Sequence, residues 1–184
     1  MFWPDSTLIS LEALICLMPV AFFIHDGEEI ATVEKYYRAN KRAPLMALGR
    51  HLIQLDKRIT IQFAAAVLLI GSFLTLITYL TIRDYDSGSQ LNMLFVGIVA
   101  VILLDGVKHV GVSAASRKYT PGVITAAVVE IPYAAYTLYR LFDAAATDVR
   151  TMAAGLGLAL PLVVFLVWFG LSLGRVVAPR RPTD

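Results

Sequence analysis

The sequence predicts an all-α integral membrane protein, a transmembrane helix bundle of five spans with one cytoplasmic amphipathic helix. Three observations support this fold class. Of the 184 residues, 58% are hydrophobic and only 16% are charged, whereas soluble domains carry about 25% charged residues. The apolar residues gather in runs of about 20, the length of helix that crosses a bilayer. The Lys and Arg residues lie mainly on alternate flanks of these runs.

The chain is long enough for one small bundle, so residues 1–184 are expected to form a single integral membrane domain. No Lys or Arg precedes the first apolar run, and we therefore expect an uncleaved span there and not a signal peptide. The predicted spans cover about residues 6–25, 61–82, 91–110, 122–141 and 151–175.

The segment between the first and second spans is the most polar part of the chain. After Pro44 its apolar residues recur at intervals of three and four, which is typical of an amphipathic helix. This pattern predicts a helix over residues 44–58 that lies on the cytoplasmic membrane surface or against the bundle. His51 borders its apolar stripe.

The distribution of basic residues predicts the orientation. The segments after spans one and three, together with the C-terminal tail, contain thirteen of the sixteen Lys and Arg residues. Because basic residues are enriched on the cytoplasmic side, the N-terminus is expected outside and the C-terminus in the cytoplasm. The expected location is the cell (inner) membrane.

A polar motif, His25-Asp26-Gly27-Glu28-Glu29, follows directly on the first apolar run. Residues three and four apart share a helix face, so His25, Glu28 and Glu29 can point the same way while Asp26 points elsewhere. Neutral imidazoles and ionised carboxylates bind zinc, iron or manganese, and they also relay protons. The motif therefore predicts a functional position where this helix leaves the bilayer.

A second pair at helical spacing, Asp105 and His109, lies at the end of the third predicted span. The predicted topology places this pair on the same side of the membrane as His25 and His51. Helix bundles build carboxylate–histidine metal sites from such pairs on facing helices. We therefore expect a divalent metal, zinc first and iron or manganese as alternatives. The expected ligands are His25, Glu28, Glu29, His51, Asp105 and His109.

Glu130 lies inside the fourth predicted span, two residues before Pro132. This proline should kink the helix and release a backbone carbonyl. An ionisable group within the membrane is costly and usually functional. We expect Glu130, with Glu28 and Glu29, to be a catalytic carboxylate that acts as an acid, a base or a bridging ligand.

These polar positions also have plain structural interpretations. The carboxylates of residues 25–29 could face water at a helix exit and pair with neighbouring basic side chains. His51 could be an interfacial histidine, and Glu130 could pair with Lys108. The second ligand pair at the same membrane depth favours the metal site.

At these residues the chain resembles the HXXEE-motif family of small integral membrane proteins. Residues 25–29 match the defining motif in full, and Arg50-His51 is similar to the family's arginine–histidine pair. The stretch from Asp105 to His109 resembles its NxxxH motif, with Asp in place of Asn. The resemblance covers roughly residues 20–130. It implies that these positions form one catalytic, metal-dependent site, and it implies no particular substrate.

The function predicted from these features is a metal-dependent membrane enzyme at the cytoplasmic membrane face. Hydrolysis of a lipid or other amphipathic substrate is the expected chemistry. The alternatives are a di-iron membrane oxidoreductase, a small metal-ion or proton transporter, and a non-catalytic membrane subunit. Clustering of ionisable groups at one depth favours the enzyme, because a transporter needs such groups along its whole path. The bilayer is the expected partner, and we expect no nucleic-acid partner.

Overall fold

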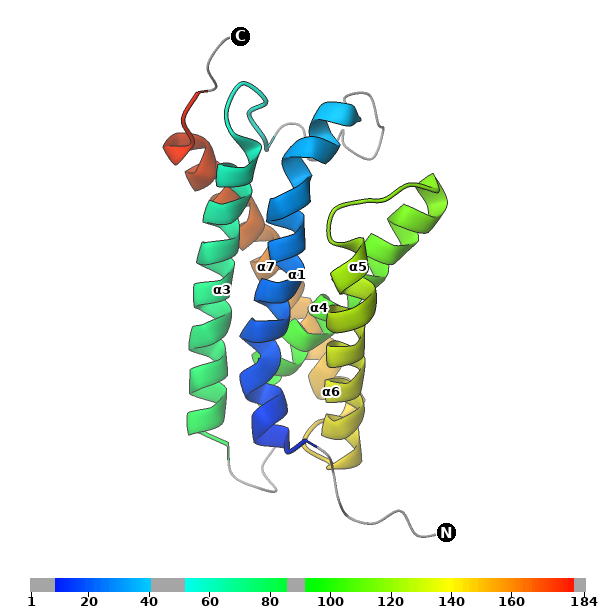
Figure 1. The fold of residues 1–184 in the computed structure, drawn as a ribbon. Coiled ribbons are helices and arrows are strands. Elements are labelled where there is room, and N and C mark those ends of the chain that lie inside the picture. The colour runs from blue at the N-terminus through cyan, green and yellow to red at the C-terminus, as the bar shows by residue number, and fades with distance from the viewer. Residues whose placement is uncertain (1–8, 41–51, 86–91, 181–184) are drawn as a thin grey trace.

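The computed structural model describes residues 9–40, 52–85 and 92–180, and within these ranges the protein is a helix bundle. Its long helices are α1 (Leu11–Ala39), α3 (Ile59–Arg83), α4 (Met93–Ser116) and α7 (Val149–Val177). Another helical stretch runs from α5 (Val123–Thr125) through the π-helix η2 (Ala126–Glu130) into α6 (Ile131–Asp143). The prediction of an all-α bundle is confirmed (Figure 1).

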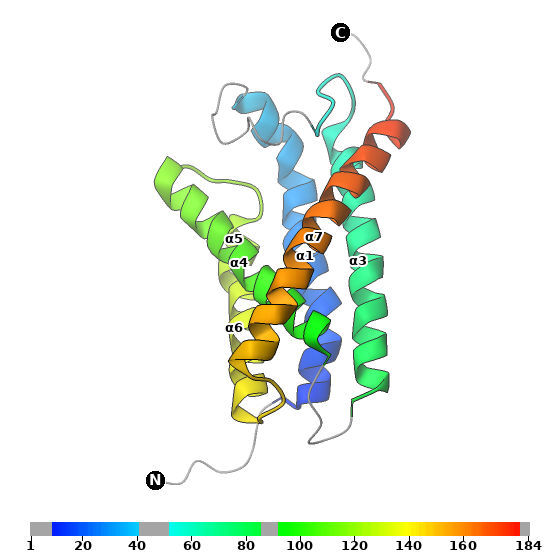
Figure 2. The same ribbon diagram turned by 180° about the vertical axis from the view of Figure 1, so that it is seen from behind.

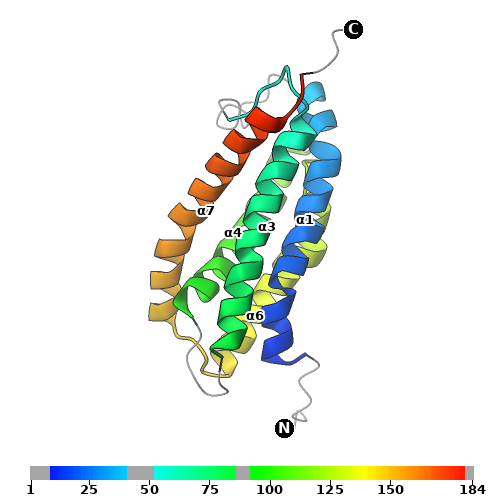
Figure 3. The same ribbon diagram turned by 90° about the vertical axis from the view of Figure 1, so that its left-hand side faces the viewer.

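The helices alternate in direction along the chain, so the described residues begin at one end of the bundle and finish at the other (Figures 1 and 2). Helix α1 packs beside α3, and α7 packs on both α3 and α4. Helix α7 lies behind α1 and α3 in Figure 1 and in front of them in the reverse view of Figure 2, and Figure 3 shows it from the side. Helices η2 and α6 pack against α4 and α1. The largest apolar core lies between these elements and includes Ile15, Leu74, Phe95, Leu141 and Ala159.

Local sequence explains where three helices begin. The side chains of Ser10, Asn92 and Asp148 each accept a hydrogen bond from a backbone N–H in the first turn of α1, α4 and α7. Such caps satisfy N–H groups that have no partner inside the helix.

Small residues set the distance between α4 and α7. A Cβ atom added to Gly97 would lie 2.1 Å from the carbonyl carbon of Gly155, so the two backbones are in direct contact there. Gly170 and Gly174 similarly face the backbone of α3 at Ala66 and Gln62. Close approach at small residues is a usual packing mode of membrane helices, where it provides van der Waals contact.

By length and composition, three of the described helices can cross a membrane, namely α3, α4 and α7. The chain is therefore a membrane protein, but five spans are not reached on this criterion. The first predicted span lies in α1, whose apolar stretch is interrupted by Glu12 and by the carboxylates of residues 26–29. The fourth lies in the α5–η2–α6 stretch, where the π-helix divides the helix into short segments.

The predicted amphipathic helix over residues 44–58 is wrong for the part that the structure describes. Residues 52–58 form turns and extended backbone, and Lys57 makes an isolated antiparallel bridge with Arg180. The backbone pairs with the chain that follows α7, which a helix would not allow. Residues 44–51 lie outside the described part of the chain.

The helices that contain the first and third predicted spans continue beyond the ends of those spans. Helix α1 extends to Ala39 although its apolar run stops at Ile24, and α4 extends to Ser116 beyond the predicted end at residue 110. Residues 25–29 are predicted to stand where this helix leaves the bilayer, and the helix itself continues for ten residues beyond Glu29. The motif lies near the middle of a long helix, where its backbone is fixed on both sides.

Candidate metal centre

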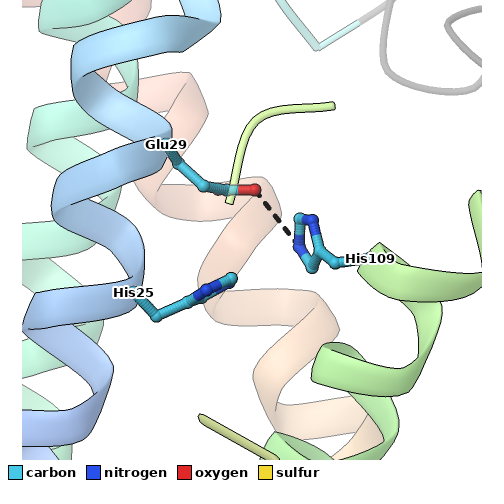
Figure 4. A group of neighbouring side chains, drawn as sticks. All are labelled: His25, Glu29 and His109. Carbon is cyan, nitrogen blue, oxygen red and sulfur yellow. Dashed lines mark ion pairs between the residues drawn. The ribbon is translucent and has the colours of Figure 1, made fainter. Parts of the chain in front are cut away.

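The motif of residues 25–29 presents two side chains from α1 toward α4. His25 and Glu29 are four residues apart and therefore lie on one face. Both point toward His109 of α4 (Figure 4). His25 is only 2% exposed, and Glu29 is partly buried. The imidazole rings of His25 and His109 have their centroids 4.8 Å apart at an interplanar angle of 75°. The predicted meeting of these two helices is confirmed.

The proton on His109 can be placed from its hydrogen bond. Its Nδ1 lies 2.9 Å from the carbonyl oxygen of Pro121, which can only accept, so Nδ1 carries a proton. Nε2 of the neutral ring then presents a lone pair. That atom lies 3.1 Å from Asp105 Oδ2 and 3.2 Å from Glu29 Oε1. A lone pair facing two carboxylate oxygens is repulsive unless a cation, either a proton or a metal ion, lies between them.

His25 has the same arrangement. The hydroxyl of Thr125 donates its proton to Glu28 Oε2 at 2.7 Å, so its oxygen is left to accept from His25 Nδ1 at 3.2 Å. Nε2 of His25 consequently faces Glu130 Oε2 at 3.4 Å and Asp105 Oδ2 at 3.8 Å. Both imidazoles are thus held by hydrogen bonds that direct their Nε2 atoms into one cluster of carboxylates, as second-sphere partners do for metal-bound histidines.

Glu130 is the most isolated of these carboxylates. It is 2% exposed, and its Oε2 has no hydrogen-bond partner among the described residues. It is the last residue of η2, and Pro132 just beyond cannot donate a backbone hydrogen bond. Single π-turns often occur at functional sites, because the extra residue changes where a side chain points. Gly106 of α4 makes room, since a Cβ there would lie 3.0 Å from Glu130 Oε2.

The donor atoms form two overlapping groups that fit a metal ion. One group is His25, Glu29 and His109, and the other is His25, Asp105 and Glu130. Within each group the ligand atoms lie within 4.8 Å of one another. Ligands bound to one ion at about 2 Å are roughly 3 Å apart, close to the separations of His109 Nε2 from its two carboxylates. Imidazoles and carboxylates suit zinc, iron and manganese alike.

Glu28 does not join these groups, although it belongs to the same motif. Its Oε1 accepts a hydrogen bond from the Tyr119 hydroxyl at 2.6 Å, and its Oε2 accepts one from the Thr125 backbone N–H at 2.7 Å. Partial burial and this bond to the Glu28 carboxylate raise the pKa of the Tyr119 phenol, which therefore donates as the neutral group. Through these hydrogen bonds, Glu28 of α1 holds the start of the α5–η2–α6 stretch against α1.

The other predicted site residues are placed as follows. Asp105 contacts both imidazoles and also forms an ion pair with Lys108 through Oδ1. His51 lies outside the described residues. The structure thus brings together His25, Glu29, Asp105, His109 and Glu130, and Glu28 lies beside them, bonded to Tyr119 and Thr125.

Sequence reasoning missed the residues that orient the two histidines. Thr125 and the Pro121 carbonyl hold the Nδ1 atoms, and Gly122 allows the loop to approach. Gly122 has φ +81°, and a Cβ added there would lie 2.7 Å from His25 Cε1. The Pro121-Gly122 pair at the start of a helix is a visible signal of a tight turn, but its contact with the site depends on the fold.

The cluster opens onto a cavity of about 520 Å³ between the helices. Its polar wall includes His25, Glu29, Asp105, Lys108, His109 and Glu130, and most of its other lining side chains are apolar. A cavity of this size, with a few convergent polar groups, is typical of small-molecule sites.

Two comparisons with known proteins find no match, since neither a curated protein nor a solved structure matches the chain. A family model described as "Protein of unknown function with HXXEE motif" matches residues 16–137. The matched range includes every described residue of the metal-ligand cluster.

Proposed function

Because the chain belongs to the family of proteins of unknown function with an HXXEE motif, we propose that this motif is half of the centre of a metal-dependent membrane enzyme. Its ligands would be His25, Glu29, Asp105 and His109. The observation that carries the proposal is the convergence of two Nε2 lone pairs on buried and partly buried carboxylates. Such a cluster is electrostatically unfavourable without a bound cation.

Hydrolysis is the reaction that this donor set supports best. When bound, a divalent ion at imidazole and carboxylate ligands supplies Lewis-acid chemistry for attack by water. Glu130 would hold a proton and deliver it to the leaving group, because one of its oxygens is free of hydrogen bonds and faces the cluster. Glu28 would act by holding Thr125, which orients His25. The substrate would be a lipid or another amphipathic molecule.

A second candidate is a dinuclear centre, which would favour a di-iron oxidoreductase. Asp105 Oδ2 is the atom that supports it, since it lies 3.8 Å from His25 Nε2 and 3.1 Å from His109 Nε2. A carboxylate between two imidazoles on different helices can bridge two ions, as in other bundle sites. The metal-to-protein ratio separates the two candidates.

The membrane placement follows from the same bundle. We propose that α1 and the α5–η2–α6 stretch also cross the membrane, because they run alongside the three apolar helices in alternating directions. The distribution of Lys and Arg then favours an N-terminus outside and a C-terminus in the cytoplasm of the cell membrane. The metal centre would lie on the cytoplasmic side.

Metal analysis of the purified chain tests the proposal. The wild type, His25→Ala and His109→Ala are each purified in detergent and examined by elemental mass spectrometry after dialysis against zinc, iron or manganese. We expect stoichiometric metal in the wild type and loss in both variants. Glu12→Gln is the matched control, because Glu12 is an exposed carboxylate on the same helix far from the cluster. A folded wild type that takes up none of the three metals would overturn the proposal.

A further inference from the structure

One carboxylate of the motif lies outside the metal-ligand groups and still faces the cavity. Asp26 is predicted to point away from the face that His25 and Glu29 share. The residues of α1 that line the cavity recur at intervals of three and four, and Asp26 is one of them, four residues after Phe22 and three before Glu29. The structure therefore directs this half-buried side chain toward the cavity.

The carboxylate of Asp26 has no partner in the part of the chain that the structure describes. The other three acidic side chains of the cavity wall, Glu29, Asp105 and Glu130, each lie 3.1 to 3.4 Å from an imidazole Nε2. No hydrogen bond or ion pair from another described residue reaches Asp26. Neither of the two groups that fit a metal ion includes it.

The cavity wall is short of hydrogen-bond donors and of positive charge. Lys108 is the one basic side chain in the described part of the wall, and it is paired with Asp105 Oδ1. Glu130 is 2% exposed, and its Oε2 has no hydrogen-bond partner among the described residues. An ionised carboxylate that is withdrawn from water is costly unless a cation or a donor replaces the water. The wall beside Asp26 therefore favours a cationic ligand.

Aromatic side chains indicate what kind of cation fits. Phe22 lies one turn before Asp26 on α1, and Tyr37 and Phe63 line the cavity farther along the same helix. The rings of Tyr37 and Phe63 have their centroids 6.4 Å apart. The face of an aromatic ring attracts an organic cation, and such walls are used to recognise ammonium groups. A largely apolar cavity of about 520 Å³ also has room for the apolar body of such a molecule.

We propose that Asp26 is the anionic subsite for an organic ammonium ion, so that the substrate is an amphiphile with a cationic nitrogen. Its apolar body lies along the wall toward Tyr37, and its reacting group lies at the neighbouring cluster of His25, Glu29 and His109. The inference names the substrate class of the proposed enzyme and rests on it for the chemistry. Binding of the cation rests separately on Asp26.

Binding of benzyltrimethylammonium to the purified full chain tests the inference. This probe joins an aromatic body to a permanent charge and has no lone pair for a metal. It is titrated by calorimetry against the wild type, Asp26→Asn, Asp26→Glu and Glu12→Gln, each dialysed against zinc, with neutral benzyl alcohol as the reference ligand. Glu12→Gln is the matched control, because it removes a carboxylate from the same helix at an exposed position outside the cavity.

The wild type and Glu12→Gln should bind one benzyltrimethylammonium per chain, more tightly than benzyl alcohol. Asp26→Asn should weaken binding of the cation by about tenfold, an effect between those of exposed and buried ion pairs. It should bind benzyl alcohol as the wild type does, which shows that the cavity is still formed. Asp26→Glu keeps the charge and should retain most of the affinity for the cation.

Equal affinities of Asp26→Asn and Glu12→Gln for the cation, or a wild type that does not prefer it to benzyl alcohol, would overturn this inference. Zinc content is measured on the same samples. Loss of zinc from Asp26→Asn would also overturn it, because Asp26 would then be a metal ligand. A chain that holds zinc but does not select the charged probe leaves the metal-enzyme proposal in place. A chain that binds the cation through Asp26 but holds no metal contradicts the enzyme proposal alone.

Discussion

At the scale of single residues, the two adjacent glutamates of the motif have different surroundings. Glu29 Oε1 faces His109 Nε2 at 3.2 Å, whereas both oxygens of Glu28 accept hydrogen bonds from Tyr119 and Thr125. Both residues share a helix face with His25, three and four positions away. The contacts from other elements therefore decide which carboxylate can bind a metal.

The first prediction separates these two glutamates. Glu29→Gln should lose the metal, because an amide is a poor ligand beside imidazoles. Glu28→Gln should keep the metal but lower the free energy of unfolding by about 1–3 kcal/mol, the usual effect of weakening charged, partly buried hydrogen bonds. Metal content and thermal unfolding in detergent are measured on both variants. The assignment fails if Glu28→Gln loses the metal and Glu29→Gln retains it.

At the scale of elements, the loop between α4 and α5 covers the two histidines and contacts both of them. Gly122 adopts φ +81°, a conformation that side chains rarely allow, and lies against His25. A methyl group there is strained by the backbone and also clashes with the imidazole.

Gly122→Ala should therefore lower both the melting temperature and the metal affinity. Gly27→Ala is the control, since a Cβ at Gly27 has nothing within 4 Å and alanine favours a helix by about 1 kcal/mol over glycine. Differential scanning fluorimetry with and without metal compares the two variants. Equal melting temperatures and affinities for the two would show that the loop does not constrain the site.

The contact between α4 and α7 gives a third prediction. A Cβ added to Gly155 would lie 2.1 Å from the carbonyl oxygen of Met93, so Gly155→Ala must push the helices apart. We expect a loss of about 1–3 kcal/mol, as for other overpacked sites. Gly157→Ala serves as the control because nothing lies within 4 Å of a Cβ there. The free energy of unfolding of both variants is measured with denaturant. Equal values for Gly155→Ala and Gly157→Ala would refute the close contact.

At the scale of the whole molecule, a metal that binds across α1 and α4 should stabilise the bundle. These helices supply the ligands from residues about eighty positions apart in the chain, so unfolding destroys the site. A ligand at about 100 times its Kd adds about 2.7 kcal/mol to the free energy of unfolding. Chelator should lower the melting temperature of the wild type, and added metal should restore it. His25→Ala should respond to neither, and a response equal to that of the wild type would place the metal elsewhere.

The orientation of the bundle gives the fifth prediction. Cys16 is replaced by serine, and single cysteines are introduced at two exposed positions, Asp56 just before α3 and Asp143 at the end of α6. The start of α3 and the end of α6 lie at opposite ends of the bundle (Figure 1). A membrane-impermeant maleimide added to intact cells should label Asp143→Cys and not Asp56→Cys. Permeabilised cells, where both should react, control for the reactivity of each thiol. The reverse labelling would invert the proposed topology.

Much of the bundle could be predicted because helical periodicity is a local property. The pairs His25/Glu29 and Asp105/His109 share helix faces wherever the helices pack, and the charge distribution predicts that both pairs lie on one side of the membrane. Hydropathy was less informative about helix ends. It marks where the apolar run stops, whereas the backbone hydrogen bonds of α1 continue to Ala39. Apolar spacing was likewise misleading for residues 52–58. Their apolar residues recur at helical intervals, but the backbone of Lys57 and Arg58 pairs with the chain beyond α7.

The sequence by itself determined that the chain is helical, that it is a membrane protein, and that two ligand pairs stand at helical spacing. These properties depend on composition and on neighbours within one turn. Only the tertiary structure decided that Glu28 accepts hydrogen bonds from Tyr119 and Thr125 and that both histidines direct Nε2 toward the carboxylates. It also decided that a largely apolar cavity adjoins the two histidines. Those features depend on contacts between segments far apart in the chain, which helical spacing does not specify.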